Sequence, residues 1–260
     1  MLALENKVFC SYPLAVQEAL LPHMHLREVQ ESEKIKRQGK SPSFYFPITA
    51  ICAQHAIIDG GYGVFTQFIG SNKMVGFSVL SARGFIEFQH EWCCAGYVFE
   101  LPGQILRDLL STKADVQLIQ MIKVFTRRLT NRLYCAEQHS KSQRLARVLL
   151  EAFDVNQSTE LIGAKHKKLS EILGTRRETV SSIIGKWQDG GILESARERL
   201  LLKDRVGLEG SACPCYEDHL KIDRDLSKYM SSLAWQLDKP CVVSTDVNRS
   251  LKCASNKTLD

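Results

Sequence analysis

Two adjacent charged residues, Arg177 and Glu178, have side chains that could read the base edges of DNA. An arginine can donate two hydrogen bonds to guanine, and a glutamate can accept one from cytosine. Both residues stand in the stretch GTRRETVSS, residues 174–182. The same stretch allows a local role, because Thr175 and Glu178 have the spacing of a capping box, which closes the first turn of a helix. Both interpretations stay open at this point.

A second group of reactive residues consists of Cys213, Cys215 and His219. Three soft ligands so close in sequence could form part of a metal site or a redox switch. They could equally pack against the preceding domain, and we favour packing. The chain has nine cysteines, an odd number, and its N-terminus MLALENKVFC does not have the pattern of a signal peptide. We therefore expect mostly reduced thiols rather than a disulfide framework.

Elsewhere no set of residues for a chemical reaction stands out. The sequence has no Ser/His/Asp order, no Walker loop and no pair of catalytic carboxylates. We therefore predict that the protein is not an enzyme and holds no metal. A thiol redox protein that uses Cys213 and Cys215 stays as an alternative.

The segment KKLSEILGTRRETVSSIIGKWQDGGIL divides at Gly174 into two short amphipathic helices. The glycine permits the positive φ of a tight turn. The first helix has an apolar face made of Leu169, Ile172 and Leu173. In the second helix the apolar residues recur at spacings of three and four and face the core: Val180, Ile183, Ile184 and Trp187. Two such helices joined by a glycine turn are typical of a helix-turn-helix motif.

A β-hairpin is expected directly after the second helix. Gly190 and Gly191 end that helix, and ILESARERLLLKD has the pattern of a strand, a turn and a second strand. Such a hairpin is a wing, and its arginines Arg197 and Arg199 could contact backbone phosphate. Leucines 200–202 would pack the wing against the helices.

The sequence LSEILGTRRETVSSIIGKWQDGGIL resembles the winged helix-turn-helix of the Crp/Fnr family of bacterial transcription regulators. The family pattern runs from an apolar helix through a glycine to Arg-Glu-Thr-Val. The resemblance implies that Arg177 and Glu178 read bases and that Thr179 contacts phosphate. Ser182 stands where many members have a second base-reading arginine, so it could contact either a base or a phosphate. Three further residues are expected to position the helix on phosphates: Arg176, Ser181 and Lys186.

The resemblance covers about residues 14–210. Short apolar runs between glycine turns, from about Val29 to Leu101, predict a β-roll or barrel. The stretch GLEGSACPCYE resembles the ending of one branch of the family, in which Cys-x-Cys-Tyr follows the wing. We expect an α+β fold with a cyclic-nucleotide-binding-like β-roll at 1–111, a dimerisation helix at 112–138, a winged helix-turn-helix DNA-binding domain at 139–212 and a partly mobile extension at 213–260.

The predicted roll lacks the pattern with which members of the family bind cyclic nucleotides. Those members carry Gly-Glu for the ribose and Arg-Ser or Arg-Thr for the cyclic phosphate. Here Arg83 is followed by glycine, and no Gly-Glu occurs between Gly70 and Gly96. Cys10 stands alone in the first fifty residues, whereas an iron-sulfur cluster needs several cysteines. We expect neither cyclic AMP, nor an iron-sulfur cluster, nor haem.

After Pro102 and Gly103 the apolar period changes from two to between three and four, which predicts a long helix. Its apolar seam is narrow and consists of Leu118, Ile122, Phe125, Leu129 and Leu133. A seam of this width fits either the β domain of the same chain or the same helix of a second subunit. We favour the second arrangement, a homodimer.

The charge of the chain permits binding to nucleic acid. The 260 residues carry a formal net charge of +5, and between 124 and 150 Glu137 is the only acidic residue among Arg127, Arg128, Arg132, Lys141, Arg144 and Arg147. A solvated helix face is at least as common a cause of such a band as DNA binding. No apolar run is long enough to cross a membrane.

These features predict a homodimeric, sequence-specific transcription regulator of the bacterial cytoplasm that binds double-stranded DNA. Its operator would be an inverted repeat with half-sites about one helical turn apart. RNA polymerase is a further candidate partner. A sensor or interaction module that has lost DNA binding is the alternative from a second class of protein. The sequence specifies neither the effector nor activation against repression.

Overall fold

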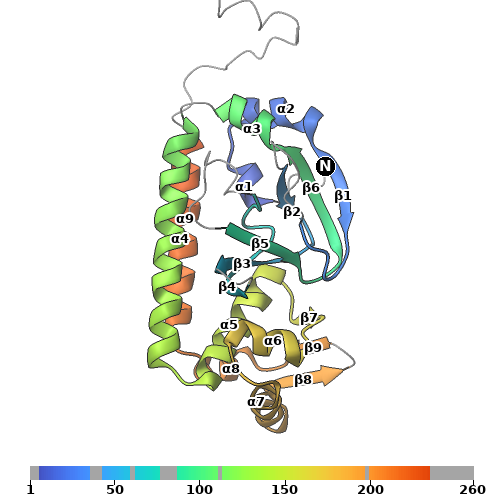
Figure 1. Ribbon diagram of the computed structural model, residues 1–260, viewed down its shortest axis with the longest axis vertical. Helices are drawn as coiled ribbons and strands as arrows, with labels where there is room; N and C mark the ends of the chain where they lie inside the picture. Colours follow the sequence, from blue (N-terminus) through green and yellow to red (C-terminus); the bar gives the residue numbers. More distant parts are fainter. Residues whose placement is uncertain are drawn as a thin grey trace, which may run out of the picture.

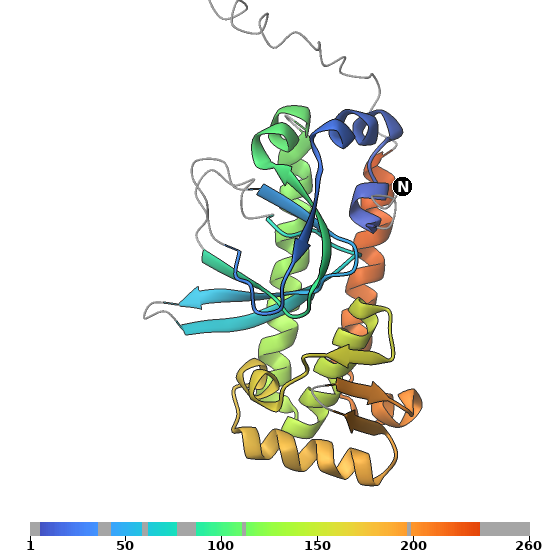
Figure 2. The ribbon, with the colours of Figure 1, turned by 90° about the vertical axis from the view of Figure 1, so that its right-hand side faces the viewer.

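The computed structural model describes residues 6–35, 43–58, 62–76, 87–110, 113–196 and 199–234. Two long helices lie side by side and span most of the length of the molecule (Figures 1 and 2). A β-rich part packs against one side of them, and a smaller part of helices and short strands lies at one end. None of the helices in the described ranges is both long and apolar enough to cross a membrane.

The β-rich part begins with three short helical segments: α1 (Lys7–Cys10), α2 (Leu14–Leu20) and the 3₁₀ helix η2 (Leu21–His23). Six strands then form two antiparallel sheets. The first sheet has the order β1-β6-β2, with β1 (His25–Val29), β6 (Gly96–Pro102) and β2 (Ser43–Pro47). The second has the order β4-β3-β5, with β4 (Tyr62–Ile69), β3 (Cys52–Ile58) and β5 (Glu87–Trp92). This arrangement confirms the predicted β-roll.

Aromatic and branched side chains from both sheets form the core of the roll. Trp92 of β5 and Val98 of β6 are fully buried, and Tyr45 of β2 packs edge-to-face on Trp92 with ring centroids 6.1 Å apart. Contacts of this kind explain why the apolar runs of the sequence become strands, since such residues fill the space between two pleated surfaces.

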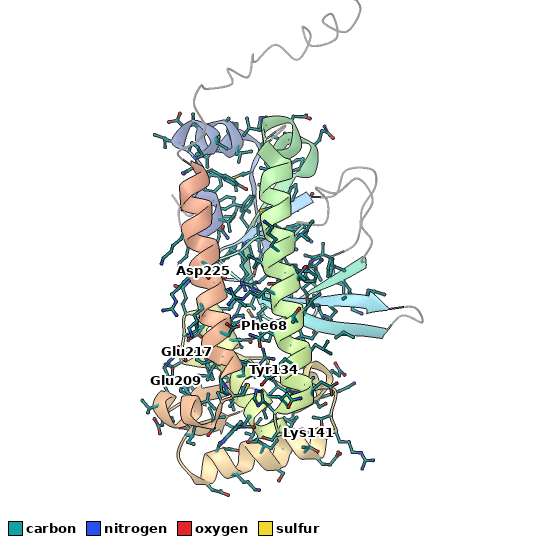
Figure 3. All side chains as sticks on the ribbon, turned by 90° about the vertical axis from the view of Figure 1, so that its left-hand side faces the viewer. Phe68, Tyr134, Lys141, Glu209, Glu217 and Asp225 are labelled. Atoms are coloured by element: carbon teal, nitrogen blue, oxygen red, sulfur yellow. The ribbon has the colours of Figure 1, made fainter. Side chains whose placement is uncertain are left out.

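Helix α3 (Gly103–Leu110) leads into the long helix α4 (Lys113–Gln138), which confirms the helix predicted from the apolar seam. Helix α9 (Cys215–Ala234) runs antiparallel along α4 (Figure 3). The sequence analysis placed residues 213–260 in an extension beyond the compact part. For α9 this is wrong, because the helix packs along α4. Ion pairs such as Arg127–Asp218 and Arg128–Asp223 hold α9 on α4. The periodicity of apolar residues in a sequence does not reveal contacts of this kind.

The remaining elements form the end of the molecule that carries the helix-turn-helix. Helix α5 (Lys141–Asn156) is followed by β7 (Glu160–Ile162), α6 (His166–Leu173), α7 (Arg177–Asp189), β8 (Leu193–Ala196), β9 (Arg199–Leu202) and α8 (Arg205–Ser211). The three strands form a sheet in the order β7-β9-β8. The core of this part continues into the roll, because buried residues of α5 pack with Phe65 and Phe68 of β4. The helix-turn-helix is therefore held directly on the roll.

Helix α5 has a capped start and a buried apolar face. Ser140 accepts a hydrogen bond from the Gln143 N–H, and the Gln143 side chain accepts one from the Ser140 N–H, which is a complete capping box. Four apolar residues of its inner face are buried: Leu145, Val148, Leu149 and Phe153.

Candidate DNA-binding site

The turn between α6 and α7 depends on Gly174, which has φ 60° and ψ 49°. Its N–H donates to the Glu171 carbonyl at 3.2 Å, and the Thr175 N–H donates to the Ser170 carbonyl at 3.0 Å. These two bonds form a Schellman motif, which ends a helix with one left-handed residue. The prediction that this glycine makes the turn is confirmed, and the motif fixes the direction in which α7 leaves α6.

The start of α7 corrects the predicted capping box. The helix begins at Arg177, and Arg176 is its N-cap residue without a capping side chain. The Thr175 hydroxyl is buried and has no hydrogen-bond partner among the described residues. The capping box of Thr175 with Glu178 is therefore wrong, because Thr175 belongs to the motif that ends α6. Glu178 lies exposed in the first turn, where the helix dipole favours a negative charge.

Helix α7 divides into a buried and an exposed face. Val180, Ile184 and Trp187 are buried in the core, and Ile183 packs against it, as predicted. The predicted DNA-contacting residues of the opposite face are exposed: Arg176, Arg177, Glu178, Ser182 and Lys186. Thr179 is half-buried. Neither Arg176 nor Arg177 forms an ion pair with an acidic side chain in the part of the chain described, so both guanidinium groups are available to a ligand.

Ser181 is tied to the neighbouring helix. Its hydroxyl lies 2.8 Å from Nδ1 of His166, at the start of α6, and the side chain is half-buried. Partial burial and the positive charge of Arg177 lower the pKa of His166. The neutral imidazole of His166 therefore joins α6 to α7. A phosphate bound by Ser181 would contact a hydroxyl that also contacts His166.

The wing is formed by β8 and β9, which pair in antiparallel register. Leu200 and Leu202 are buried and Leu201 is half-buried, so the wing packs down through its second strand. Arg199 is exposed and forms an ion pair of 3.1 Å with Glu160 of β7. Arg197, the other predicted phosphate contact of the wing, lies outside the described residues.

Three arginines of the basic band are structural residues: Arg128 and Arg147 are buried, and the Arg132 side chain is 14% exposed. Arg128 of α4 pairs with Asp223 of α9, while Arg132 and Arg147 both pair with Glu151, at 2.7 and 2.9 Å. The band was interpreted as a surface for nucleic acid or for solvent, and for these three residues both interpretations are wrong. Their partner acids lie just after the band, in α5, or far along the chain, in α9.

The charges in this network stay ionised at neutral pH. Burial lowers the pKa of Arg132 to about 10, although Glu151 counteracts the effect. Burial alone would raise the pKa of Glu151, but the positive charges of the surrounding groups, Arg132 and Arg147 among them, outweigh it and hold that pKa well below its usual range. The arginines of the network therefore serve the fold and are not free for DNA.

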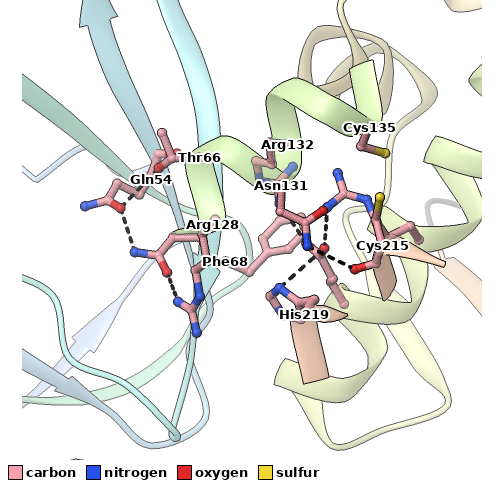
Figure 4. Close-up of polar contacts among 12 residues, drawn as sticks. Gln54, Thr66, Phe68, Arg128, Asn131, Arg132, Cys135, Cys215 and His219 are labelled. Atoms are coloured by element: carbon pink, nitrogen blue, oxygen red, sulfur yellow. Dashed lines mark hydrogen bonds and ion pairs between the residues drawn. The ribbon is translucent and has the colours of Figure 1, made fainter. Parts of the chain in front are cut away.

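A chain of polar contacts links the network to the interior of the roll (Figure 4). His90 contacts Gln54 at 3.1 Å, and Gln67 donates to the Gln54 side-chain oxygen at 2.7 Å. Gln67 in turn accepts from Arg128. The cavity beside these groups measures only about 10 Å³, which is room for about one water molecule. Arg83, on which the expectation about cyclic nucleotides depends, lies outside the described residues.

The predicted dimer seam is partly exposed. Ile122 and Leu133 are 52% and 65% exposed. Phe125 and Leu129 are half-buried, and Phe125 packs edge-on against Phe88 of the roll with ring centroids 5.1 Å apart. The side chain of Leu118 lies outside the described residues. Helix α9 packs on the adjacent polar face of α4 through ion pairs. It does not cover the apolar seam residues Ile122 and Leu133, which stay exposed.

The predicted trio of Cys213, Cys215 and His219 does not come together. The third member of the cluster is Cys135 of α4, whose Sγ lies 3.5 Å from that of Cys213. His219 instead points toward Glu151 and Asp223, at 3.6 and 3.7 Å. Sequence reasoning missed Cys135 because a single cysteine near the end of a helix carries no motif.

Comparison with known families defines the C-terminal part. Residues 143–210 match the family model of the Crp-like helix-turn-helix domain. This segment contains α6, α7 and the wing, so it includes most of the exposed residues described above. No curated protein sequence is significantly similar to the chain.

Solved structures share the fold over most of the chain. A protein from Eubacterium rectale assigned to the crp/fnr family of transcriptional regulators is 15% identical, with a TM-score of 0.59, over 78% of this chain and 96% of that one. FixK2 from Bradyrhizobium japonicum is 16% identical, with a TM-score of 0.59, over 73% and 98% of the two chains. A CRP-family regulator from Thermus thermophilus is 16% identical, with a TM-score of 0.55, over 73% and 99%.

At these identities the structures establish the fold, and the family match establishes the helix-turn-helix domain. Residues 143–210 form a Crp-like helix-turn-helix domain, within a fold similar to that of the Crp/Fnr regulators described above. This agrees with the predicted α+β fold and with the predicted helix-turn-helix.

Proposed function

We propose that the chain acts as a homodimer on an inverted-repeat operator, with Arg177 and Glu178 reading base edges. The observation that carries this proposal is the exposed first turn of α7 in a Crp-like helix-turn-helix, with arginines that have no partner in the described part of the chain. The N-terminal residues of a recognition helix are the ones that reach base edges in the major groove. Two such helices related by a two-fold axis would require half-sites about one helical turn apart.

The other exposed residues would position the helix rather than read the sequence. Arg176, Thr179 and Lys186 are assigned to backbone phosphates, with Arg199 of the wing as a further contact. Ser181 is assigned to phosphate through its hydroxyl hydrogen, which it can donate while its oxygen accepts from the Nδ1–H of His166, 2.8 Å away. Ser182 could contact either a base or a phosphate.

The dimer proposal is supported by a groove between α4 and the start of α9. Its volume is about 770 Å³. Apolar, small polar and charged side chains line it, among them Ile122, Thr126, Tyr134, Lys123 and Asp218. Tyr134 is 57% exposed beside Leu133. Large apolar side chains gathered on one face of a long helix are typical of a surface that another subunit covers. The same helix of a second copy would place its own seam here.

Operator selection from random DNA tests the base-reading role, followed by binding measurements at several salt concentrations. We expect Arg177→Ala to cost about 1 to 3 kcal/mol and to relax one position of the selected site. Lys186→Ala is the matched control, which should weaken binding to all sequences alike and lower the salt slope by about one. An equal loss on all sequences with Arg177→Ala would show that this residue only contacts phosphate.

Sedimentation at micromolar concentration tests the dimer. We expect Leu133→Asp to give monomers, because a charge in an apolar interface loses its hydration without a partner. Leu14→Asp is the matched control, since Leu14 of α2 is 69% exposed but lies away from the seam. A monomeric parent protein, or a dimer unchanged by Leu133→Asp, would contradict the proposal.

We propose further that cyclic AMP is not the effector, because the Arg-Gly at 83 and 84 departs from the phosphate-binding pair of the cyclic-nucleotide members. Calorimetric titration with cyclic AMP should give no binding heat and no change in operator affinity. RNA polymerase is the proposed partner in the bacterial cytoplasm. Transcription in vitro from a promoter that contains the selected operator would show whether the regulator activates or represses it.

A further inference from the structure

Three cysteines from distant parts of the sequence meet where α4 ends and α9 begins. Cys135 lies in the last turns of α4, Cys213 just before α9, and Cys215 at the first position of α9. All three are buried, and their sulfur atoms lie within 4.8 Å of one another. Figure 4 places Cys135 and Cys215 across from each other at this junction.

The spacing of the sulfur atoms fits ligands of one metal ion. A tetrahedral site with metal–sulfur bonds of about 2.3 Å separates neighbouring sulfur atoms by about 3.8 Å. Cys135 and Cys213 are 3.5 Å apart, and the third sulfur lies within 4.8 Å of both. A disulfide would use two of the thiols and leave the third, whereas a metal ion uses all three.

His139 could supply the fourth ligand. It follows Cys135 by four residues, and its Nε2 atom is buried without a hydrogen-bond partner among the described residues. His139 and Cys215 line the same groove. The imidazole lies outside the group of three thiols, packed edge-on against Tyr134 with ring centroids 5.7 Å apart, so it would turn to reach the ion.

We propose that Cys135, Cys213 and Cys215 bind one thiophilic divalent cation of the zinc type, with His139 as the fourth ligand. Three thiolates and an imidazole are a common ligand set of structural zinc sites. The sequence had led us to expect no metal, because only two of the four ligands are neighbours in the chain. The ion would join the end of α4 to the start of α9, directly beside the helix-turn-helix, and so fix α9 along the proposed dimer helix.

Titration of the reduced full-length protein with Co²⁺ tests this site, because cobalt replaces zinc and reports its ligands in its absorption spectrum. We expect one Co²⁺ per chain, with an intense thiolate-to-cobalt charge-transfer band and the visible bands of tetrahedral coordination. The intensity per cobalt should correspond to three thiolates, and Zn²⁺ should remove the bands by displacing the cobalt.

Four ligand variants and one control variant assign the ligands. Each of Cys135→Ser, Cys213→Ser and Cys215→Ser should lose charge-transfer intensity, while Cys10→Ser, at the exposed cysteine of α1, should not. His139→Gln should weaken binding and shift the visible bands but keep the charge-transfer band. Circular dichroism of each variant checks that the fold is intact.

The spectrum of the parent protein decides the matter even where a serine variant fails to fold. A reduced parent that shows no charge-transfer band on addition of Co²⁺ overturns the proposal. So does a band that survives in all three serine variants. Formation of a Cys135–Cys213 disulfide on oxidation, in a protein that takes up no Co²⁺ when reduced, would assign the cluster to redox chemistry instead.

Discussion

Arginines near the start of α7 and arginines of α4 and α5 have opposite environments in the same protein. Arg176 and Arg177 are exposed and lack acidic partners in the described ranges, while Arg147 is buried and Arg132 largely covered, and both pair with the buried Glu151. The local sequence does not distinguish the two groups, because both are basic residues on amphipathic helices. What distinguishes them is where the acidic residues lie in space. A basic stretch is therefore evidence for DNA binding only once its partners are known.

The two groups should also differ in what they contribute to stability. Removing one member of a buried ion pair leaves a charge without compensation, which costs about 3 to 5 kcal/mol. Exposed charges contribute about 0 to 1 kcal/mol, because water screens them. The same substitution made in both regions would test this difference directly.

The largest effect is expected for Glu151→Gln. Its carboxylate accepts hydrogen bonds from both Arg132 and Arg147, so the amide would leave the buried guanidinium of Arg147 and the largely covered one of Arg132 without a counter-charge. We expect the free energy of unfolding to fall by about 3 to 5 kcal/mol. Urea denaturation would measure it. Glu178→Gln is the control and should change the same quantity by less than about 0.5 kcal/mol.

A loss below about 1 kcal/mol for Glu151→Gln would mean that the network is no more important than surface pairs. The comparison between the two arginine groups would then fail on energetic grounds, although the difference in exposure would remain.

The pH dependence of stability should come next in size and depend on His219. Burial, together with nearby positive charges, lowers its pKa to about 3, although Glu151 acts in the other direction. The groups that face it are Glu151, Asp223, Lys73, Arg128 and Arg132. The unfolded chain would take up a proton near pH 6.5 while the folded chain does not. Stability is therefore full above pH 6.5 and is lost as the pH falls toward 3.

The expected loss is about 1.4 kcal/mol for each pH unit, or about 3 kcal/mol between pH 6 and pH 4, from this residue alone. His219→Gln should remove this part of the slope. Thermal or urea unfolding of both proteins at each pH would measure it. Parallel pH curves for parent and variant would show that His219 titrates normally in the fold. His90 of the roll, whose pKa burial lowers to about 4, should keep its own contribution in both proteins.

A smaller effect is expected at the turn of the helix-turn-helix. Gly174→Ala places a side chain at φ 60°, which costs about 1 to 2 kcal/mol because Cβ crowds the following carbonyl. Gly185→Ala within α7 is the matched control, since beyond the neighbouring backbone a Cβ at either glycine meets no described atom within 4 Å. It should raise stability by about 0.5 to 1 kcal/mol through helix propensity. Equal signs for the two substitutions in urea denaturation would contradict the role assigned to the turn.

The helix-turn-helix could be predicted from the sequence because its determinants are local. The apolar period, Gly174 and the pair Gly190 and Gly191 all act within a few residues. The error at Thr175 also has a local cause, since the same threonine fits a capping box and a Schellman motif equally well on spacing. Only the backbone hydrogen bond from Thr175 to Ser170 decides between them.

The pairing of α4 with α9 could not be predicted in this way. Arg128 and Asp223 are 95 residues apart, and Cys135 and Cys213 are 78 apart. Neither pair leaves a periodic signal, because polar and thiol contacts need only one residue on each side. Glu151 stands one residue beyond the band in which Glu137 seemed to be the only acid. Extending the band by one residue would have included Glu151 as an acidic partner for the arginines. The sequence would still not have shown that Glu151 is buried.

Glu178→Gln has the smallest expected effect on stability and the sharpest effect on recognition. Because Glu178 closes no capping box, the substitution changes the chemistry of the exposed first turn and leaves the helix end as it is. A glutamine amide pairs with adenine, whereas a glutamate accepts from cytosine, so the preferred base should change at one position of each half-site. The discrimination at that position should be about 1 to 3 kcal/mol. Operator selection with parent and variant proteins measures both, and the base read by Arg177 serves as the internal control. If the selected site does not change, the carboxylate reads no base, and the exposed charge of Glu178 serves only the dipole of its helix.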